Sequence, residues 1–187
     1  RLERAGHTVT VLEKLARPGG RTLAIDLHGY RFDTGPTLFL MPTVFAQTYA
    51  DLGEDMHKHL DLIRLDPTYR VHFHDGSSID LTSDLIHMRD QLESMEPGSF
   101  QRFLSFMEEG YRHYTLSLSS FVGRNFLSYA DYFSPANLPL LFKLKALQKH
   151  APNVARYFGD RRLRAAFSFQ NMYLGLSPME AMATYAL

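Results

Sequence analysis

The chain has 187 residues, enough for one domain and part of a second. Its 20 Lys and Arg residues balance 20 Asp and Glu residues, so there is no basic field to attract nucleic acid. Cysteine is absent from the sequence, which excludes disulfides, thiolate nucleophiles and cysteine metal sites. Apolar residues make up 45% of the chain, so its composition allows a packed core.

The two ends of the chain are expected to interrupt longer elements, so we interpret the sequence as a fragment. Runs without charge, such as Ala165 to Met179, are shorter than the ~20 apolar residues that cross a bilayer. No signal peptide is evident, and we do not expect a secreted protein.

The first part of the chain has the pattern of an α/β unit. Arg1–Ala5 is typical of the last turn of a helix, and Gly6 follows as the terminating glycine. The β-branched run Thr8–Leu12 predicts a parallel strand that is buried on both faces. Two short runs, Leu23–Leu27 and Tyr30–Phe32, predict a hairpin.

Further along, Thr43–Leu52 predicts a helix, and the runs Tyr69–His74 and Ser78–Leu81 predict a second hairpin around Asp75-Gly76. Helical patterns dominate from about residue 84. They are expected at Leu85–Met95, Phe100–Tyr114 and Leu138–His150, after an Asp160 cap, and from a capping box at Ser177–Glu180. We therefore predict a partial Rossmann-like α/β domain over residues 1–83 and a mainly helical part over residues 84–187.

One set of residues in the first part points to a dinucleotide. Glu13 follows the predicted strand, where an acid can accept hydrogen bonds from ribose hydroxyls. Gly19-Gly20-Arg21 offers backbone that a pyrophosphate can approach closely, beside a fixed positive charge. A surface glutamate paired with Lys14 is the simpler interpretation of Glu13 when that residue is considered alone.

Glu13, Gly19-Gly20-Arg21, Gly29, Asp33 and Gly35 together resemble the second dinucleotide-binding motif of the FAD-dependent amine oxidase and carotenoid desaturase superfamily. The resemblance implies FAD as the cofactor, and we expect Asp33 to hold its turn rather than to touch the ligand. The family's glycine-rich phosphate loop would lie before Arg1. The implied cofactor-binding residues are Glu13 at the ribose, Gly19, Gly20 and Arg21 at the pyrophosphate, and Thr34, Gly35, Pro36 and Thr37 toward the flavin.

Two stretches, Phe32–Thr37 and Phe167–Pro178, are similar to segments of bacterial and fungal phytoene desaturases. This resemblance implies FAD-dependent dehydrogenation of phytoene or a related acyclic carotenoid. The flavin would perform the redox chemistry, so the sequence identifies no catalytic side chain. The implied substrate-binding residues are Phe167, Phe169, Met172 and Tyr173.

Two alternatives remain open. One is another flavoprotein of the superfamily, such as a carotenoid isomerase, a retinol saturase or an amine oxidase. The other is a non-catalytic prenyl-lipid-binding protein of the GDP-dissociation-inhibitor type. Glu13 together with an intact Gly-Gly-Arg favours FAD over the second alternative.

Contacts with lipid are expected in the second part of the chain. The aromatic stripe Phe100–Tyr114 fits either core or the lining of a tunnel, and Leu138–His150 fits either a packed helix or a basic helix in a membrane interface. The resemblance implies peripheral contact with a membrane at its cytoplasmic face. Arg161, Arg162 and Arg164 are interpreted as a solvated helix face, with phosphate binding as the alternative. His72 and His74 lack a third ligand, so no metal site is predicted.

Overall fold

The computed structural model describes residues 1–35 and 39–185, and these divide into two compact units, Arg1–Arg64 and Leu65–Leu187. The described strands form two separate antiparallel hairpins. The units meet at residues 64 and 65, whereas the sequence predicted a change at residue 83. Compactness does not divide the chain by ligand, so the cofactor and substrate division stays a prediction.

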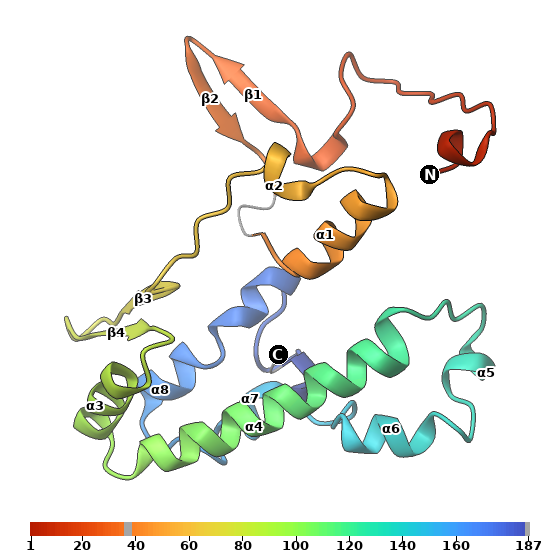
Figure 1. The fold of residues 1–187 in the computed structure, drawn as a ribbon. Coiled ribbons are helices and arrows are strands. Elements are labelled where there is room, and N and C mark those ends of the chain that lie inside the picture. Colours follow the sequence, from red (N-terminus) through yellow and green to blue (C-terminus); the bar gives the residue numbers. More distant parts are fainter. Residues whose placement is uncertain (36–38, 186–187) are drawn as a thin grey trace. The chain divides into compact units, whose positions relative to one another are not determined.

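Among its described residues, the first unit contains one hairpin and two α-helices, which Figure 1 shows in red and orange. Its strands β1 and β2 pair from Ala24 opposite Asp33 to Leu27 opposite Tyr30, so the predicted hairpin is confirmed. The turn between them needs left-handed backbone, which Gly29 adopts at a φ of 82°. The bounds are β1 Ala24–Leu27, β2 Tyr30–Asp33, α1 Pro42–Asp51 and α2 Met56–His59.

The helix α1 confirms the helical prediction for Thr43–Leu52. Pro42 occupies its first turn, where the missing N–H is not needed, and Gly53 follows its end with a φ of 72°. At the start of the chain, a short 3-10 helix Glu3–Ala5 ends at Gly6 as predicted. An ion pair between Arg1 and Asp51 joins this turn to the end of α1.

The prediction of a buried strand at Thr8–Leu12 is wrong. These residues form no strand, and Val11 and Leu12 are 81% and 91% exposed. A parallel strand depends on neighbours that pair with its backbone and cover its faces. No described strand pairs with Thr8–Leu12, so its pattern has no partner.

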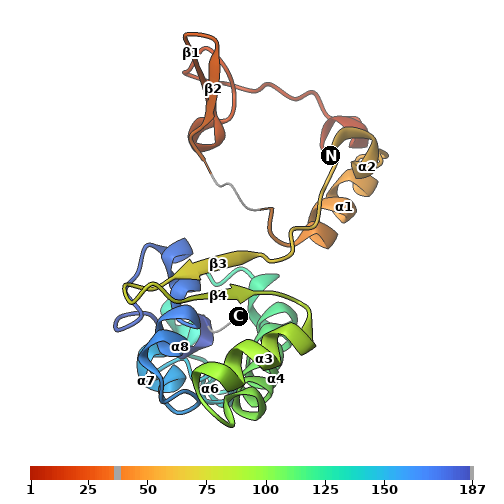
Figure 2. The ribbon, with the colours of Figure 1, turned by 90° about the vertical axis from the view of Figure 1, so that its left-hand side faces the viewer.

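The second unit combines one hairpin with six α-helices among its described residues, and Figure 2 shows the hairpin beside the helical part. The pairing of Tyr69 with Leu81 and of His72 with Ser78 confirms the predicted second hairpin. The bounds are β3 Tyr69–His72, β4 Ser78–Leu81, α3 Leu85–Met95, α4 Ser99–Ser117, α5 Tyr129–Tyr132, α6 Leu138–Lys143, α7 His150–Val154 and α8 Arg161–Ala166.

Local signals explain where these elements begin. The Asp75 carboxylate accepts from Ser77 N at 2.9 Å and tightens the hairpin turn. Asp84 caps α3 by accepting from Ile86 N at 2.9 Å. Asp160 caps α8 by accepting from Arg162 N at 2.7 Å, as predicted.

The core of the second unit joins the hairpin to α3, α4, α7 and α8. Phe106 of α4 lies against Phe158 at 5.8 Å between ring centroids, and Phe158 stacks on Phe167 at 4.6 Å. Such aromatic pairs add to the stabilisation by area burial. The buried members are Ile79, Met88, Leu92, Phe103, Phe106, Val154, Phe158, Leu163, Ala166 and Phe167.

Two helical predictions need correction. The helix expected over Leu138–His150 ends at Lys143, because Lys145 takes left-handed backbone with a φ of 52° that no α-helix accommodates. Ser177 accepts from Met179 N at 3.2 Å, as an N-cap side chain does, but the reciprocal bond of the predicted capping box is not among the described contacts, and only one turn follows. Beyond that turn Ala181 O accepts from His150 N at 2.8 Å, which draws the chain into a bridge instead of a helix.

A buried ionic network holds the conformation at Lys145. The Glu109 carboxylate pairs with the Lys145 ammonium, and it accepts from Asn153 Nδ2 at 2.7 Å and from Tyr157 Oη at 2.8 Å. Burial alone would raise the pKa of Glu109, but these three donors outweigh it and lower that pKa to about 2. Burial and the bond to Glu109 raise the pKa of Tyr157 to about 12.

A second carboxylate fixes the connection between α7 and α8. Glu96 at the end of α3 accepts from Gly159 N at 3.0 Å and from Asp160 N at 2.8 Å. It also pairs with Arg102, whose Nε donates to Tyr157 O at 2.7 Å. The entry to α8 is therefore bound to both α3 and α4.

Candidate cofactor and substrate sites

The predicted pyrophosphate residues form a tight turn in the first unit. Gly19 and Gly20 have φ values of 132° and 53°, which favour glycine. A short 3-10 helix, Gly20–Thr22, follows, and Thr22 donates from N and from Oγ1 to Gly19 O at 2.9 and 2.7 Å. We call residues 19–22 the glycine turn.

The glycine turn packs directly on a second turn at Thr34 and Gly35. Thr34 donates from N and from Oγ1 to Leu23 O at 3.2 and 2.5 Å. A Cβ on Gly35 would lie 2.5 Å from Arg21 O and 2.9 Å from Thr22 Cα. Both neighbours are backbone and cannot swing aside, so this approach requires glycine. The structure thus brings together Gly19, Gly20, Arg21, Thr34 and Gly35.

The residues of the glycine turn fit the phosphates of a dinucleotide. At Gly20 the space that a Cβ would fill has no atom within 4 Å, so the backbone there is open to a ligand. The exposed Arg21 guanidinium has no hydrogen bond or ion pair with any described residue. Phosphate oxygens accept hydrogen bonds from guanidinium groups and from accessible backbone N–H groups.

Glu13 is not part of this pair of turns. Glu13 Oε1 accepts from Leu15 N at 2.9 Å, and no hydrogen bond or ion pair links Glu13 to the glycine turn within the described ranges. Pro36 and Thr37 lie outside the described residues. Arg17, which the sequence did not single out, pairs with Asp26 of β1 at 3.5 Å.

The second unit contains an apolar groove of about 610 Å³. A volume in this range is typical of small-molecule sites. Hairpin β3–β4 forms one wall and α4 another. The lining residues are Thr68, Tyr69, Leu81, Thr82, Ser83, Met88, Phe103, Phe106, Met107, Gly110, Tyr111, Tyr114, Phe167 and Gln170.

The aromatic stripe of α4 divides between the core and the apolar groove. Phe103 and Phe106 are buried in the core and reach the groove, whereas Met107, Tyr111 and Tyr114 line the groove and are partly open to solvent. The stripe therefore gives the core and the groove a common wall.

The predicted substrate residues divide between the groove and the surface. Phe167 lines the groove, and Phe169 meets the Tyr69 ring edge-on at 5.6 Å. Met172 and Tyr173 are exposed and do not line it.

Sequence patterns did not identify Tyr69, which they assigned to a strand. Its hydroxyl is buried with no partner among the described residues, and burial raises its pKa, so it stays a neutral phenol. A buried Tyr hydroxyl usually finds a partner, and that expectation is the only signal that could have marked it.

Residues 122–147 expose many large apolar side chains. Leu127 is 93% exposed, Tyr129 87% and Phe142 73%. Asp131 is the single acid between residues 118 and 149, which contain four basic residues. We call residues 122–147 the aromatic surface. Within the described residues, no helix is both long and apolar enough to cross a membrane.

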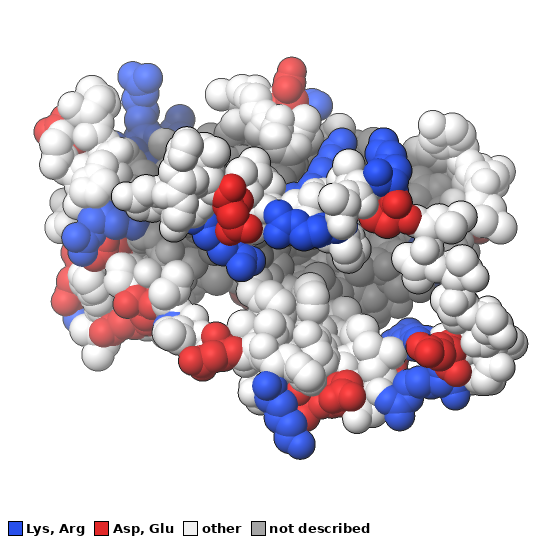
Figure 3. Space-filling view, turned by 90° about the horizontal axis from the view of Figure 1, so that it is seen from above, with Lys and Arg blue, Asp and Glu red and all other residues white. Residues whose placement is uncertain are grey.

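Charges of both signs are mixed over the face drawn in Figure 3, in keeping with the zero net charge of the chain. Arg162 is not a solvated residue as predicted, because it pairs with Asp160 at 2.7 Å and with Asp75 at 3.2 Å.

Comparisons with known proteins agree with the motif. Residues 1–187 match the model of a family described as flavin containing amine oxidoreductase. Over the whole chain it is 44% identical to a zeta-carotene-forming phytoene desaturase of Myxococcus xanthus, of which it covers 36%. It is 40% identical to a phytoene desaturase of Phycomyces blakesleeanus and 29% identical to a 4,4'-diapophytoene desaturase of Staphylococcus aureus, again over the whole chain, and covers 32% and 37% of them. The chain thus spans about a third of the length of these relatives, and it belongs to the flavin containing amine oxidoreductase family.

Proposed function

We propose that the whole protein is an FAD-dependent oxidoreductase that desaturates phytoene or a related acyclic carotenoid. The observation that carries the proposal is the packing of Gly35 on the backbone of Arg21 and Thr22, because it brings two predicted flavin-site turns together. The names of the relatives, which are phytoene and diapophytoene desaturases, support the choice of substrate.

FAD held at this site would supply a hydride acceptor for the CH–CH unit that becomes a double bond, while the neighbouring carbon of that unit would lose a proton. The chain would hold the cofactor. In this proposal Glu13 accepts from the ribose hydroxyls, and the glycine turn lies along the pyrophosphate. Thr34, Gly35, Pro36 and Thr37 direct backbone toward the flavin. Residues 1–83 then form the cofactor part and residues 84–187 the substrate part.

The apolar groove is the proposed substrate site. An acyclic polyene carries no group that needs a hydrogen bond, so burial of its surface, at about 25 cal/mol per Å², would supply the affinity. The aromatic rings of α4 and Phe167 suit such a chain. Phe169 supports the wall at Tyr69, and Met172 and Tyr173 extend the proposed contact beyond the groove.

Peripheral contact with the cytoplasmic face of a membrane completes the proposal. The substrate is insoluble in water and has to be collected from a bilayer. The aromatic surface supports this role, because it combines exposed Leu127, Tyr129 and Phe142 with Arg124 and Lys143, which outnumber its single acid, Asp131.

The decisive experiment supplies phytoene in liposomes to the purified whole protein and analyses the products. The protein is expected to show flavin absorbance and to form conjugated polyenes. Formation of no polyene by the flavin-loaded protein would contradict the substrate assignment.

The ribose role has its own test. Glu13→Ala is expected to weaken FAD binding by about 1.5–3 kcal/mol, the value of a charge-assisted hydrogen bond. Glu3→Ala is the matched control, because Glu3 is exposed in the same unit and makes no side-chain hydrogen bond or ion pair with any described residue. Equal FAD affinities of the two variants would remove Glu13 from the site.

A second candidate follows from the family description, which names amine oxidoreductases. Oxidation of an amine by the flavin-loaded protein, without any polyene from phytoene, would favour this candidate. A protein that binds prenyl lipid and cannot be reconstituted with FAD would favour the non-catalytic alternative.

A further inference from the structure

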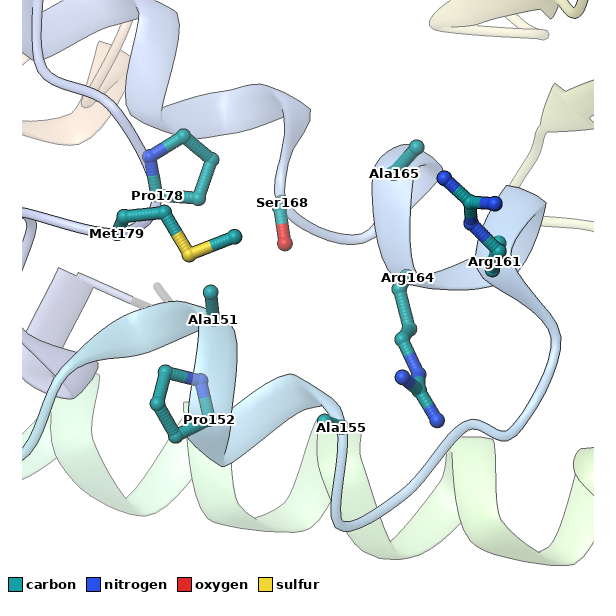
Figure 4. A pocket seen from close by; sticks show the side chains of 9 residues that line it. All are labelled: Ala151, Pro152, Ala155, Arg161, Arg164, Ala165, Ser168, Pro178 and Met179. Atoms are coloured by element: carbon teal, nitrogen blue, oxygen red, sulfur yellow. The ribbon is translucent and has the colours of Figure 1, made fainter.

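A second hollow in the Leu65–Leu187 unit lies away from the apolar groove and has a different chemistry. Figure 4 shows it as a cleft between α7, α8 and the turn at Pro178 and Met179. Its volume is about 500 Å³. Ser168 of the cleft lies between Phe167 and Gln170 of the apolar groove in the sequence, and no residue lines both hollows.

One end of the cleft is apolar. Ala151, Pro152 and Ala155 of α7 and its end form the floor, and Pro178 and Met179 close the side opposite α8. These side chains are small or flexible and carry no polar group, so they leave room for a hydrocarbon segment rather than for a polar ligand.

The other end of the cleft carries two guanidinium groups. Arg164 donates from Nε to Phe158 O at 2.7 Å, which fixes its side chain and leaves its terminal nitrogens available. Arg161 has no hydrogen bond or ion pair with any residue that the structure describes. Neighbouring Arg162 is different, because Asp160 and Asp75 neutralise it. Two cations without counter-charges thus face one end of the cleft.

A polar group also lies between the two ends. Ser168 is only 6% exposed, and Figure 4 shows its hydroxyl directed into the cleft. The hydroxyl has no hydrogen-bond partner among residues 1–35 and 39–185. The hydroxyl oxygen opens into the cleft, so it can hydrogen-bond with a ligand atom there.

We propose that this cleft binds a single-chain amphiphile with an anionic head. The head, a phosphate or a carboxylate, sits between Arg161 and Arg164 and accepts a hydrogen bond from Ser168, since guanidinium groups match these anions. The first carbons of the chain lie over Ala151 and Ala155. The polyene of the proposed reaction carries no charge, so the cleft takes a different ligand and stands independently of the flavin chemistry.

The test is calorimetric titration of the whole protein with dodecyl phosphate below its critical micelle concentration. Saturable binding is expected. Arg161→Gln should weaken it at least about tenfold, which corresponds to about 1.4 kcal/mol. Arg156→Gln is the matched control, since Arg156 belongs to the same unit and does not line the cleft. Flavin absorbance of each variant checks that it is folded.

A second variant and a second ligand test the apolar end. Ala155→Trp fills the floor and is expected to abolish binding of dodecyl phosphate. Inorganic phosphate should bind much more weakly than dodecyl phosphate. The proposal is overturned if dodecyl phosphate does not saturate, if Arg161→Gln and Arg156→Gln bind it equally, or if inorganic phosphate binds as tightly.

The same variants identify the source of the amphiphile. Vesicles of phosphatidylcholine with an equal part of phosphatidylglycerol present anionic heads in a bilayer. If Arg161→Gln weakens binding to these vesicles as well as to dodecyl phosphate, the cleft takes the head of a membrane lipid. If it weakens only the binding of dodecyl phosphate, the ligand is a free amphiphile.

Discussion

Removing the charge of Glu109 should destabilise the second unit more than any exposed substitution on α4. Glu109→Gln keeps the shape of the side chain but leaves the Lys145 ammonium, which is 19% exposed, without its counter-charge. The new amide also presents a donor to Asn153 or Tyr157, where the structure needs an acceptor. Breaking a buried ion pair on one side costs about 3–5 kcal/mol.

The lowered pKa of Glu109 reflects the same contacts. Its fall from 4.5 to about 2 corresponds to roughly 3 kcal/mol at 1.36 kcal/mol per pKa unit. Because the folded pKa is the lower one, this stabilisation is complete above the unfolded pKa of 4.5 and is lost as the pH falls toward 2. Glu109→Gln should therefore be less stable at neutral pH. Its stability should also fall less steeply as the pH is lowered.

Hydrogen exchange of the α4 and α7 amides in the whole protein measures the local free energy of opening. The matched control is Glu108→Gln, which makes the same chemical change at an exposed position of α4. Protection factors for Glu109→Gln that equal those for Glu108→Gln would refute the reasoning. Equal loss of protection in acid by both variants would refute the assignment of the pH dependence to Glu109.

Three further substitutions test other parts of the structure. Gly35→Ala should cost about 1–3 kcal/mol of local stability and lower FAD retention, because its methyl group would meet backbone atoms. Gly123→Ala is the control, because its methyl group would meet open space. Equal FAD content in the two variants would argue against the paired turns. Met107→Trp should fill the apolar groove and reduce phytoene conversion at unchanged flavin content. Ser105→Trp, on the exposed side of α4, should leave phytoene conversion unchanged. Equal conversion by the two variants would exclude the groove as the substrate site. Glu96→Gln should increase exchange of the Gly159 and Asp160 amides by removing a charged acceptor worth about 1.5–3 kcal/mol, and unchanged exchange would show that the contact is dispensable.

Signals that act over a few residues predicted local structure well. The Asp75-Gly76 turn, the alternation on both sides of it and the cap at Asp160 need only neighbouring residues, and the structure has each of them. The apolar run Thr8–Leu12 failed as a predictor because a buried strand depends on partners elsewhere in a sheet. The run has the composition of a buried strand, but no strand in the described part of the chain pairs with it.

Sites assembled from distant residues were only partly predictable. The glycines at positions 19, 20 and 35 were found through their motif, although only the structure shows why position 35 must be glycine. The groove and the Glu109 network were not predicted, since they join residues far apart in the sequence. Lys145 is the clearest case, because nothing local marks it for left-handed backbone, and its ion pair with Glu109 holds it there.

The way Glu96 binds the connection between α7 and α8 has a consequence for engineering. Surface connections normally accept added residues, but tolerance depends on what their backbone binds. Here the backbone amides of Gly159 and Asp160 both donate to the Glu96 carboxylate. A residue inserted at either position would therefore break both hydrogen bonds. Tags and grafted loops in this half of the chain therefore belong at connections whose backbone amides do not bind a side-chain carboxylate.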